Sequence, residues 1–373
     1  MRLTINKKEF LKGLLIASRA IASKSTLPTL LNFKLEMGER GLEITASNED
    51  ITIWTLVPTI KDDKEIVRNF SFGTTLINAH SLTEIVKKMQ GEEISIEIID
   101  DRTANIDDGN TKYHLNCLLA DEYPDIDLEQ TEDTFEISCR DLTKLVDSTA
   151  FAASDQNNRP ILTVINLSGR NGKLTATATD SARLSRNSVE ISEDINFSAN
   201  IAAKTLVEVT RLFENTPTVG ICVNSSRAIF NFGYTIVKSR LIPGDYPVSN
   251  GVFPSNFNYR LSISANDLLN AIDRVSVLAT DRAAIVKLSM SQNGIEVSSS
   301  SEQVGSGAES IQNFQYLGER LEISFNALFV TQAVKALCSD DVEFKFCGEM
   351  KPFVVINPND DQMIELITPM RTR

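Results

Sequence analysis

The 373-residue chain is poor in the side chains on which most enzyme and metal sites depend. It has only two histidines, His80 and His114, which nearly excludes histidine-rich metal sites and most nucleophile–base pairs. Its five cysteines contain no C-x-x-C pair, and their odd number argues against a disulfide framework or a zinc ribbon. The P-loop, G-x-S-x-G and G-x-G-x-x-G motifs are absent. We therefore expect no catalytic site, no metal and no cofactor.

Long apolar runs are also missing. No stretch reaches membrane-spanning length, and the apolar residues 14–17 are stopped by Arg19, which makes them too short for a signal peptide. The unpaired cysteines suit a reducing compartment. We expect a cytoplasmic protein that is not inserted into a membrane.

What the sequence does have is a globular composition with an acidic balance. Hydrophobic residues make up 42% and charged residues 23%, which fits folded domains with a sizeable core. The 37 basic and 50 acidic residues give a net charge of −13, so the molecule as a whole repels nucleic acids at long range. Any nucleic-acid role must then use a local basic surface.

A threefold internal repeat is the most informative pattern. Alternating apolar and polar residues that run into a helical pattern start at Leu3, Phe135 and Leu261, at intervals of 132 and 126 residues. A second helical pattern recurs at intervals of 124 residues and is marked by Leu82, Leu206 and Val330. The extended segment 118–124 recurs as 241–247. A single match could arise by chance, but ordered matches in register favour a true repeat.

The repeat predicts the fold class. We expect an α+β protein of three pseudo-repeated domains, each with two helices packed on antiparallel sheets. The expected domains are residues 1–127, 128–255 and 256–373. In the first helix, Phe10, Leu11, Leu14 and Leu15 are expected to form the apolar face.

Basic residues gather on the predicted helices, against the charge balance of the whole chain. Such a face can contact phosphates without reading bases. An ordinary solvated helix face is the simpler alternative, and acidic residues on the same helices weaken the signal. The candidate DNA-facing residues are Lys8, Lys12, Arg19, Lys24, Arg140, Lys144, Lys204 and Arg211.

Four short motifs carry a family resemblance. They are LPTL at residues 27–30, ATDSARL at 178–184, SRLIPGDYP at 239–247 and TPMR at 368–371. Each is only moderately specific alone. In this order, inside a threefold repeat, they make the chain resemble the bacterial DNA polymerase III beta subunit, the DNA sliding clamp, over essentially its whole length.

The resemblance implies a processivity factor of DNA replication that has no catalytic site of its own. In that family two chains pair head to tail into a closed ring of six domains, with helices lining the hole and sheets outside. A ring on duplex DNA slides but cannot leave sideways, so it tethers a polymerase without tight binding. The implied partners are a second copy of the chain, double-stranded DNA without sequence preference, the DNA polymerase III catalytic subunit, the clamp loader and other proteins with clamp-binding motifs. Lys24 would contact the duplex near the ring face.

The resemblance also implies a pocket into which a short linear motif of partner proteins docks. Aliphatic and methionine side chains suit an adaptable apolar trough, and Arg183 or Arg371 can hold a peptide carboxylate or carbonyl. Carried over position by position, this motif trough comprises Leu162, Thr179, Ser181, Ala182, Arg183, Leu184, Pro247, Val252, Phe329, Met350, Pro352, Leu366, Ile367, Pro369, Met370 and Arg371.

Two positions depart from the family pattern. Gly251 stands where the family often has arginine, and Ala182 where a histidine can occur, so we expect a weaker polar grip on the motif. For Leu184, Phe329 and Met370 the simpler alternative is an ordinary core position.

The subunit joint has one clue of its own. Val277 and Leu278 fall outside the expected core face of the third repeat's first helix, which suggests a contact with something else. By resemblance they match the joint of the family, as do Tyr113 and Leu115 on an edge strand of the first repeat. Pairing of edge strands would also hide sheet edges that invite aggregation.

Two alternatives stay open. A carboxylate group could bind magnesium for nuclease chemistry, and it consists of Asp121, Glu122, Asp125, Asp127 and Glu129. The chain could also be a monomeric adaptor that never encircles DNA, which its mass in solution would reveal.

Overall fold

The computed structural model describes residues 1–22, 24–25, 27–126, 134–193, 195–214, 216–247, 250–278 and 284–371. The chain forms two compact units. The first comprises Met1–Cys139 and Glu208–Leu241, and the second comprises Arg140–Val207 and Ile242–Arg373. Among the described residues, no helix is both long enough and apolar enough to cross a membrane.

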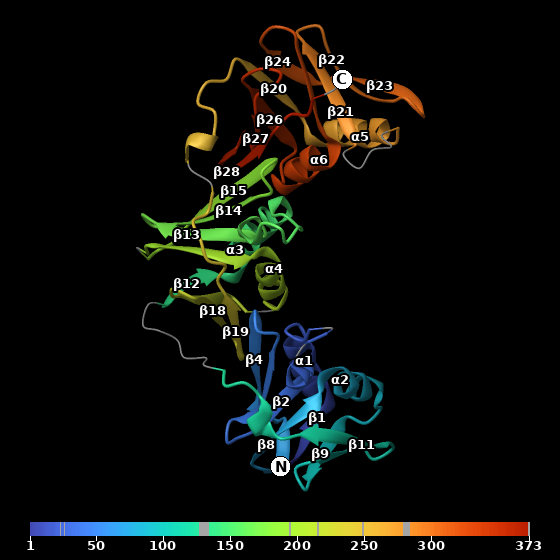
Figure 1. Cartoon of the computed structure of the whole chain (residues 1–373), viewed down its shortest axis with the longest axis vertical. Helices are drawn as coiled ribbons and strands as arrows, with labels where there is room; N and C mark the ends of the chain where they lie inside the picture. The colour runs from blue at the N-terminus through green and yellow to red at the C-terminus, as the bar shows by residue number, and fades with distance from the viewer. Residues whose placement is uncertain are drawn as a thin grey trace. The chain divides into compact units, whose positions relative to one another are not determined.

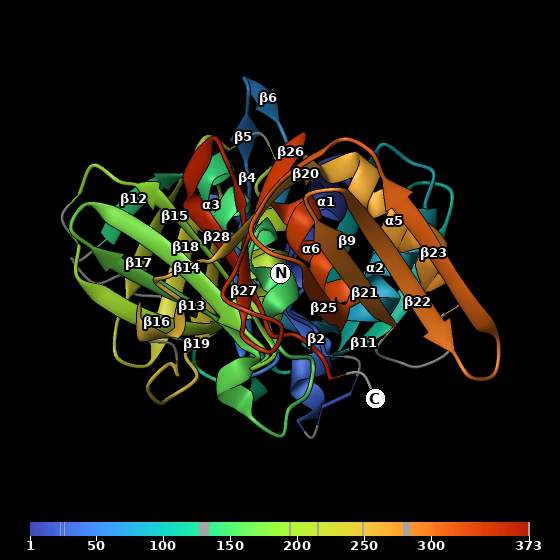
Figure 2. The same ribbon diagram turned by 90° about the horizontal axis from the view of Figure 1, so that it is seen from above.

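The first unit is built on one sheet of thirteen described strands that pair antiparallel (Figure 1). Their order is β12 (Thr134–Ser138), β17 (Thr218–Val223), β18 (Arg227–Phe232), β19 (Thr235–Arg240), β4 (Ile51–Pro58), β3 (Gly41–Ser47), β2 (Asn32–Met37), β8 (Gly73–Asn78), β11 (Lys112–Leu118), β10 (Thr103–Asp107), β9 (Glu93–Ile99), β1 (Arg2–Asn6) and β7 (Val67–Ser71). A short hairpin is formed by β5 (Ile60–Lys61) and β6 (Lys64–Glu65), and it projects clearly in Figure 2. The pairing of β19 with β4 joins strands of the first and second repeats.

Two helices, α1 (Lys7–Ser18) and α2 (Ala79–Lys88), pack together in the first unit, and α1 also lies on β3 and β4. The contact is close at Gly13, where an added Cβ would lie 2.9 Å from both Ile44 and Val57. Phe10 and Leu14 are buried as predicted, but Leu15 is 48% exposed. The prediction for Leu15 was wrong because the helix packs on the sheet with the face that contains Gly13. A pattern of apolar side chains does not reveal this face, since glycine has no side chain.

The second unit contains two larger sheets, again antiparallel. The nine described strands of one follow the order β16 (Phe197–Ala202), β13 (Val164–Arg170), β14 (Lys173–Thr179), β15 (Arg183–Glu190), β28 (Asp360–Ile367), β27 (Phe353–Asn357), β26 (Asp341–Phe346), β20 (Tyr259–Ser264) and β24 (Phe314–Leu317). The other follows the order β23 (Gly305–Ile311), β22 (Gly294–Ser301), β21 (Ile285–Ser291) and β25 (Leu321–Asn326). Helices α5 (Ala265–Ser276) and α6 (Ala327–Ala336) pack together over a core that includes Phe325, Phe344 and Phe353.

The helices bear out the predicted α+β repeat. A strand leads directly into a helix at β1–α1, at β12 with α3 (Cys139–Asp147), and at β20–α5. The same occurs at β8–α2, at β16 with α4 (Ala203–Arg211), and at β25–α6. Polar side chains at Asn6, Asn78, Ser264 and Asn326 accept backbone N–H groups at the starts of α1, α2, α5 and α6. The predicted boundary near residue 128 lies outside the described residues.

A buried carboxyl group lies where the second repeat pairs with the third. Glu365 on β28 is opposite Ser185 on β15, and only 2% of it is exposed. The Ser185 Oγ lies 2.6 Å from Glu365 Oε1 and 2.6 Å from the carbonyl oxygen of Ser148. Because a hydroxyl has one proton to donate, a protonated Glu365 that donates to Ser185 satisfies both contacts. Burial raises the pKa of Glu365 well above its usual range, against smaller effects of Ser185 and Arg183.

We predict that Glu365→Gln stabilises the protein increasingly as the pH rises. The pKa of Glu365 is raised in the folded state. The contribution of Glu365 to the free energy of unfolding is therefore fully present below its unfolded-state pKa of about 4.3, and it is lost as the pH rises toward the folded-state pKa. The loss should approach about 1.4 kcal/mol per pH unit, and the glutamine variant should escape it.

Urea unfolding at about pH 5, 7 and 8.5 measures this difference. Glu349→Gln is the matched control because Glu349 is exposed. A difference between Glu365→Gln and wild type that stays constant with pH would show that Glu365 is ionised in the fold.

Candidate functional site

The predicted motif trough lies entirely within the second unit. Strand pairing places Leu184 of β15 opposite both Thr179 of β14 and Leu366 of β28. The buried members are Leu162, Thr179, Leu184, Leu366, Ile367 and Pro369. The half-buried members are Ala182, Arg183, Phe329, Pro352 and Met370. The exposed members are Ser181, Pro247, Val252, Met350 and Arg371.

Three parts of this set can be placed by their neighbours. Leu184 and Leu366 form a small apolar cluster with Val354, against which Phe253 and Phe257 pack. Ile367 belongs to the core of the third repeat, and Phe329 packs against that core. Leu184, Leu366 and Ile367 are thus core residues, whereas Val252 and Met350 are 42% and 53% exposed.

A cavity of about 430 Å³ brings three other members together. Met350, Met370 and Arg371 line it beside Glu349 and three residues of paired strands, Lys287, Glu322 and Ser324. The Met370 N–H donates to the carbonyl oxygen of Ser324 at 2.7 Å, which ties the C-terminal segment to β25. Spacing in the sequence gave no sign of the strand residues, because they reach the cavity only through β21–β25 pairing.

Arg183 is held by the fold on several sides. Its Nε donates to Asp180 Oδ2 at 3.0 Å, and its terminal nitrogens donate to the Phe151 carbonyl and the Gln332 side chain. Its guanidinium carbon lies 4.4 Å from the ring centroid of Phe329. Burial lowers the pKa of Arg183, while Asp180 opposes this effect. These contacts suit a residue that positions Phe329 and the 180–184 turn.

The candidate DNA-facing cations are not buried, but half of them are already paired. Lys12 pairs with Glu214, and Arg19 and Arg211 approach the same carboxylate of Glu208 at 3.3 and 2.8 Å. Lys144 lies 3.4 Å from Asp360. Within the described part of the chain, no ion pair is formed by Lys8, Lys24, Arg140 and Lys204.

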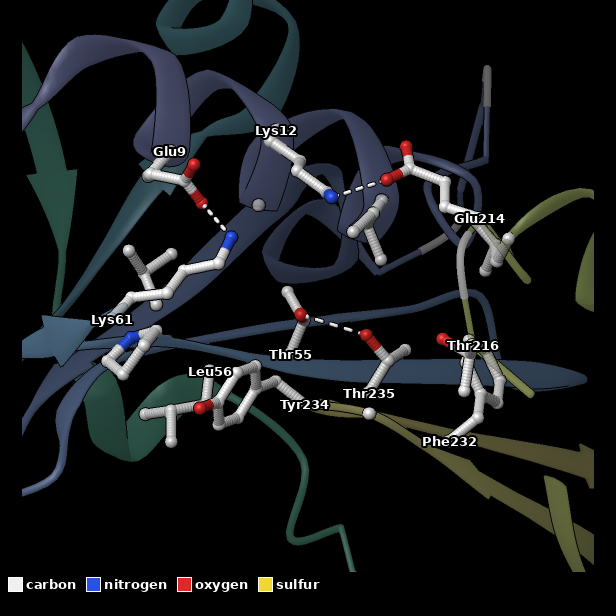
Figure 3. A pocket seen from close by; sticks show the side chains of 16 residues that line it. Glu9, Lys12, Thr55, Leu56, Lys61, Glu214, Thr216, Phe232, Tyr234 and Thr235 are labelled. Atoms are coloured by element: carbon white, nitrogen blue, oxygen red, sulfur yellow. Dashed lines mark hydrogen bonds and ion pairs between the residues drawn. The ribbon is translucent and has the colours of Figure 1, made fainter. Parts of the chain in front are cut away.

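Lys12 also borders a cavity of about 140 Å³ in the first unit, between α1 and the β4–β19 pair (Figure 3). On the other side, Glu9 accepts from Lys61 at 2.7 Å, and this contact raises the pKa of Lys61. The Thr55 and Thr235 hydroxyls meet at 3.0 Å on its floor. Its four charged groups thus form two ion pairs.

The predicted joint residues lie on two strand edges or next to them. Tyr113 and Leu115 are half-buried on one face of β11, which pairs along its length with β10 but meets β8 only at Cys117 and Leu118. Most of one β11 edge therefore lacks a partner among the described strands.

At the other candidate edge, Val277 is 79% exposed. Leu278 lies over β23, since a Cβ on Gly307 would come within 2.8 Å of its Cδ1. β23 is one of the two edge strands of its sheet as described. Both edges are thus accompanied by apolar side chains.

The carboxylate alternative gains no support from the described residues. Asp121 and Glu122 lie in a short 3-10 turn, Ala120–Glu122. No three His, Cys, Asp or Glu side chains in the described ranges are arranged to hold a metal ion. Asp127 and Glu129 lie outside the described residues.

Comparisons with known proteins agree over the whole chain. Family models of the DNA polymerase III beta subunit match as its N-terminal domain over residues 1–127, central domain over 136–248 and C-terminal domain over 250–371. The Beta sliding clamps of Bacillus subtilis and Staphylococcus aureus are 33% and 31% identical to this chain, over 100% of both sequences.

Solved structures agree as well. The DNA polymerase sliding clamp of Bacillus subtilis superposes with a TM-score of 0.96 at 31% identity, and the beta chain of Streptococcus pneumoniae with 0.95 at 28%, each over 100% of both chains. Matches of this extent in sequence and fold leave one conclusion: the chain belongs to the DNA polymerase III beta subunit family, the sliding clamps.

Proposed function

We propose that two copies of this chain pair head to tail into a ring that encircles duplex DNA and keeps DNA polymerase III and other DNA-processing proteins on it. The observation that carries this proposal is the threefold strand–helix repeat, which the sliding-clamp family matches from end to end. The ring acts as a processivity factor and needs no catalytic site. In this proposal the domain boundaries lie near residues 128 and 255, and the matched ranges 1–127, 136–248 and 250–371 support a division into three domains.

We expect the attraction between the protein and DNA to be weak because of how its charges are distributed. The net charge of −13 opposes long-range attraction, and Lys12, Arg19 and Arg211 are partly neutralised by acids of the same unit. Four exposed cations form no ion pair with the described residues, and in this proposal they supply the phosphate contacts: Lys8, Lys24, Arg140 and Lys204. Retention on DNA then rests on encirclement.

The motif trough is the docking place for partners. Its floor is apolar and its rim carries the mobile thioether of Met350 and the cation of Arg371, a combination suited to a short extended peptide with bulky apolar residues. The catalytic subunit of DNA polymerase III, the clamp loader and other proteins with clamp-binding motifs would share it.

Retention on a DNA circle tests encirclement. After a clamp-loader ATPase has loaded it on a nicked circle, the protein should stay bound. Linearising the circle should release the protein as soon as it slides to a free end. On linear duplex alone, binding should be weak and should fall steeply with salt concentration. Pull-down of labelled protein before and after restriction cleavage provides the measurement, and retention on open linear DNA equal to that on the circle would argue against a ring.

The joint can be opened by charge. Replacing Val277 and Leu278 by aspartate should give folded monomers of 41.3 kDa instead of dimers of twice that mass. Burying two unpaired charges at a contact costs several kcal/mol. Sedimentation equilibrium reports the mass, with Leu317→Asp as the matched control because Leu317 is 66% exposed on β24 of the same unit. An unchanged mass in the double variant would show that Val277 and Leu278 do not form the subunit joint.

Removing the last four residues, 370–373, should abolish stimulation of the polymerase while the protein stays dimeric. The deletion takes away Met370 and Arg371, two walls of the 430 Å³ cavity, but nothing at the proposed joint. Calorimetry with an apolar peptide should show at least a tenfold loss of affinity. The Val277 and Leu278 double variant is the reciprocal control, because it should bind the peptide as a monomer. Normal peptide binding by the truncated chain would refute the trough assignment.

A further inference from the structure

Arg183 connects the second repeat with the third inside the second unit. It begins β15 in the second repeat, and its Nη1 donates to the side chain of Gln332 on α6 of the third repeat. Its guanidinium carbon also lies 4.4 Å from the ring centroid of Phe329, one turn earlier on the same helix. The proposed function gives no role to Gln332, although Gln332 takes part in this link.

All the guanidinium nitrogens of Arg183 donate hydrogen bonds within the chain. Nε donates to Asp180 at 3.0 Å, and Nη2 donates to the carbonyl oxygen of Phe151, besides the bond from Nη1 to Gln332. Only 11% of the side chain is exposed. Because a buried charged group is costly unless its hydrogen bonds are made, the loss of one partner weakens the hold on the whole group. Arg183 is therefore arranged to join segments of the chain to one another.

The second-repeat side of this link is fixed by backbone hydrogen bonds. Asp180 accepts the N–H groups of Ala182 and Arg183 at 2.9 and 3.0 Å, and so holds the turn that leads into β15. The Ala182 carbonyl oxygen accepts the Thr368 N–H at 2.9 Å, which ties the turn to the C-terminal segment. Asp180 thus holds both the backbone and the side chain of Arg183, and the guanidinium leaves the turn in a fixed direction.

On the third-repeat side, the hydrogen bond from Arg183 ends on the amide oxygen of Gln332. Gln332 is half-buried, and Phe329 lies on the same side of α6, because residues three apart in a helix are neighbours. Leu184, which directly follows Arg183, and Phe329 are both members of the proposed motif trough. The Arg183–Gln332 bond thus joins the elements that carry these two members, one from each repeat.

We propose that Gln332 is a positioning residue for partner docking: through Arg183 it holds α6 against the 180–184 turn, which keeps Leu184 and Phe329 at the spacing that a partner peptide requires. The peptide itself would not touch Gln332. A peptide binds only the molecules in which its site is assembled, so its apparent affinity falls with the fraction of molecules in that state. The inference rests on the proposed function of the motif trough.

This role predicts a kinetic signature. When a site is assembled in only a fraction of the molecules, the apparent association rate falls by that fraction, while dissociation from the assembled complex is unchanged. A residue that contacts the peptide behaves differently, because the loss of a contact mainly raises the dissociation rate. The two rate constants therefore separate a positioning role of Gln332 from direct contact.

Stopped-flow fluorescence measures both rate constants on the full chain, with a labelled synthetic peptide that ends in leucines as the probe. Gln332→Met keeps the length of the side chain but lacks the acceptor oxygen. It should lower the association rate about threefold to tenfold and leave the dissociation rate within about twofold of wild type. Gln332→Glu should associate as fast as wild type, because a carboxylate also accepts a hydrogen bond from a guanidinium.

Lys335→Met is the matched control, because Lys335 is exposed on the same helix, and it should change neither rate constant. A double-mutant cycle tests whether Gln332 acts through Arg183. In an Arg183→Met background, Gln332→Met should cause no further change. If urea unfolding shows that Arg183→Met does not fold, the milder Arg183→Lys provides the background, since an ammonium cannot reproduce the planar fork of donors.

An association rate of Gln332→Met equal to that of wild type would overturn the inference and leave the trough in place. A change confined to the dissociation rate would also overturn it, because Gln332 would then be a peptide contact. So would an effect of Gln332→Met that persists undiminished beside the Arg183 substitution, since Gln332 would then act by another route. If the wild type binds no peptide, the trough assignment itself fails, and the inference fails with it.

Discussion

Backbone pairing between strands of different repeats is the constraint on which the rest of each unit depends. In the first unit β19 pairs with β4, and in the second β15 pairs with β28. Each pairing fixes a register, and a slip of one residue would turn every side chain to the opposite face. Only the observed register sets Leu184 opposite Leu366, two residues of the proposed motif trough. The same register buries Glu365 beside Ser185 on the other face.

Much of this architecture could be predicted from the sequence. Alternation that runs into helical periodicity marked the strand–helix junctions, and a threefold recurrence separated them from chance. Periodicity failed at Leu15, because the position of α1 is set by the missing side chain of Gly13. A pattern of apolar residues records what a helix can bury but not how closely its backbone approaches a sheet.

The site was predictable to a lesser degree. Resemblance supplied the members of the motif trough, and the structure adds the neighbours that hold them, such as Gln332 on Arg183 and Phe253 between Leu184 and Arg186. These neighbours come from distant segments of the chain, so the spacing of residues in the sequence could not predict them. The same holds for the charges: Arg19 meets Glu208 across 189 positions of sequence, so the basic helix could be predicted but its partial neutralisation could not.

The carboxylate of Glu208 bears on how easily DNA could slide past the basic helices. It lies 3.3 Å from Arg19 and 2.8 Å from Arg211, two of the cations proposed to face DNA. If duplex DNA contacts these arginines as proposed, each arriving phosphate has to displace the Glu208 carboxylate, and the carboxylate returns when the phosphate leaves. The net change in free energy at each step is therefore small, and the surface offers a moving duplex shallow wells in place of deep ones. Acidic side chains placed among cations in this way would lower the free-energy barriers to sliding while the polyanion stays close to the protein.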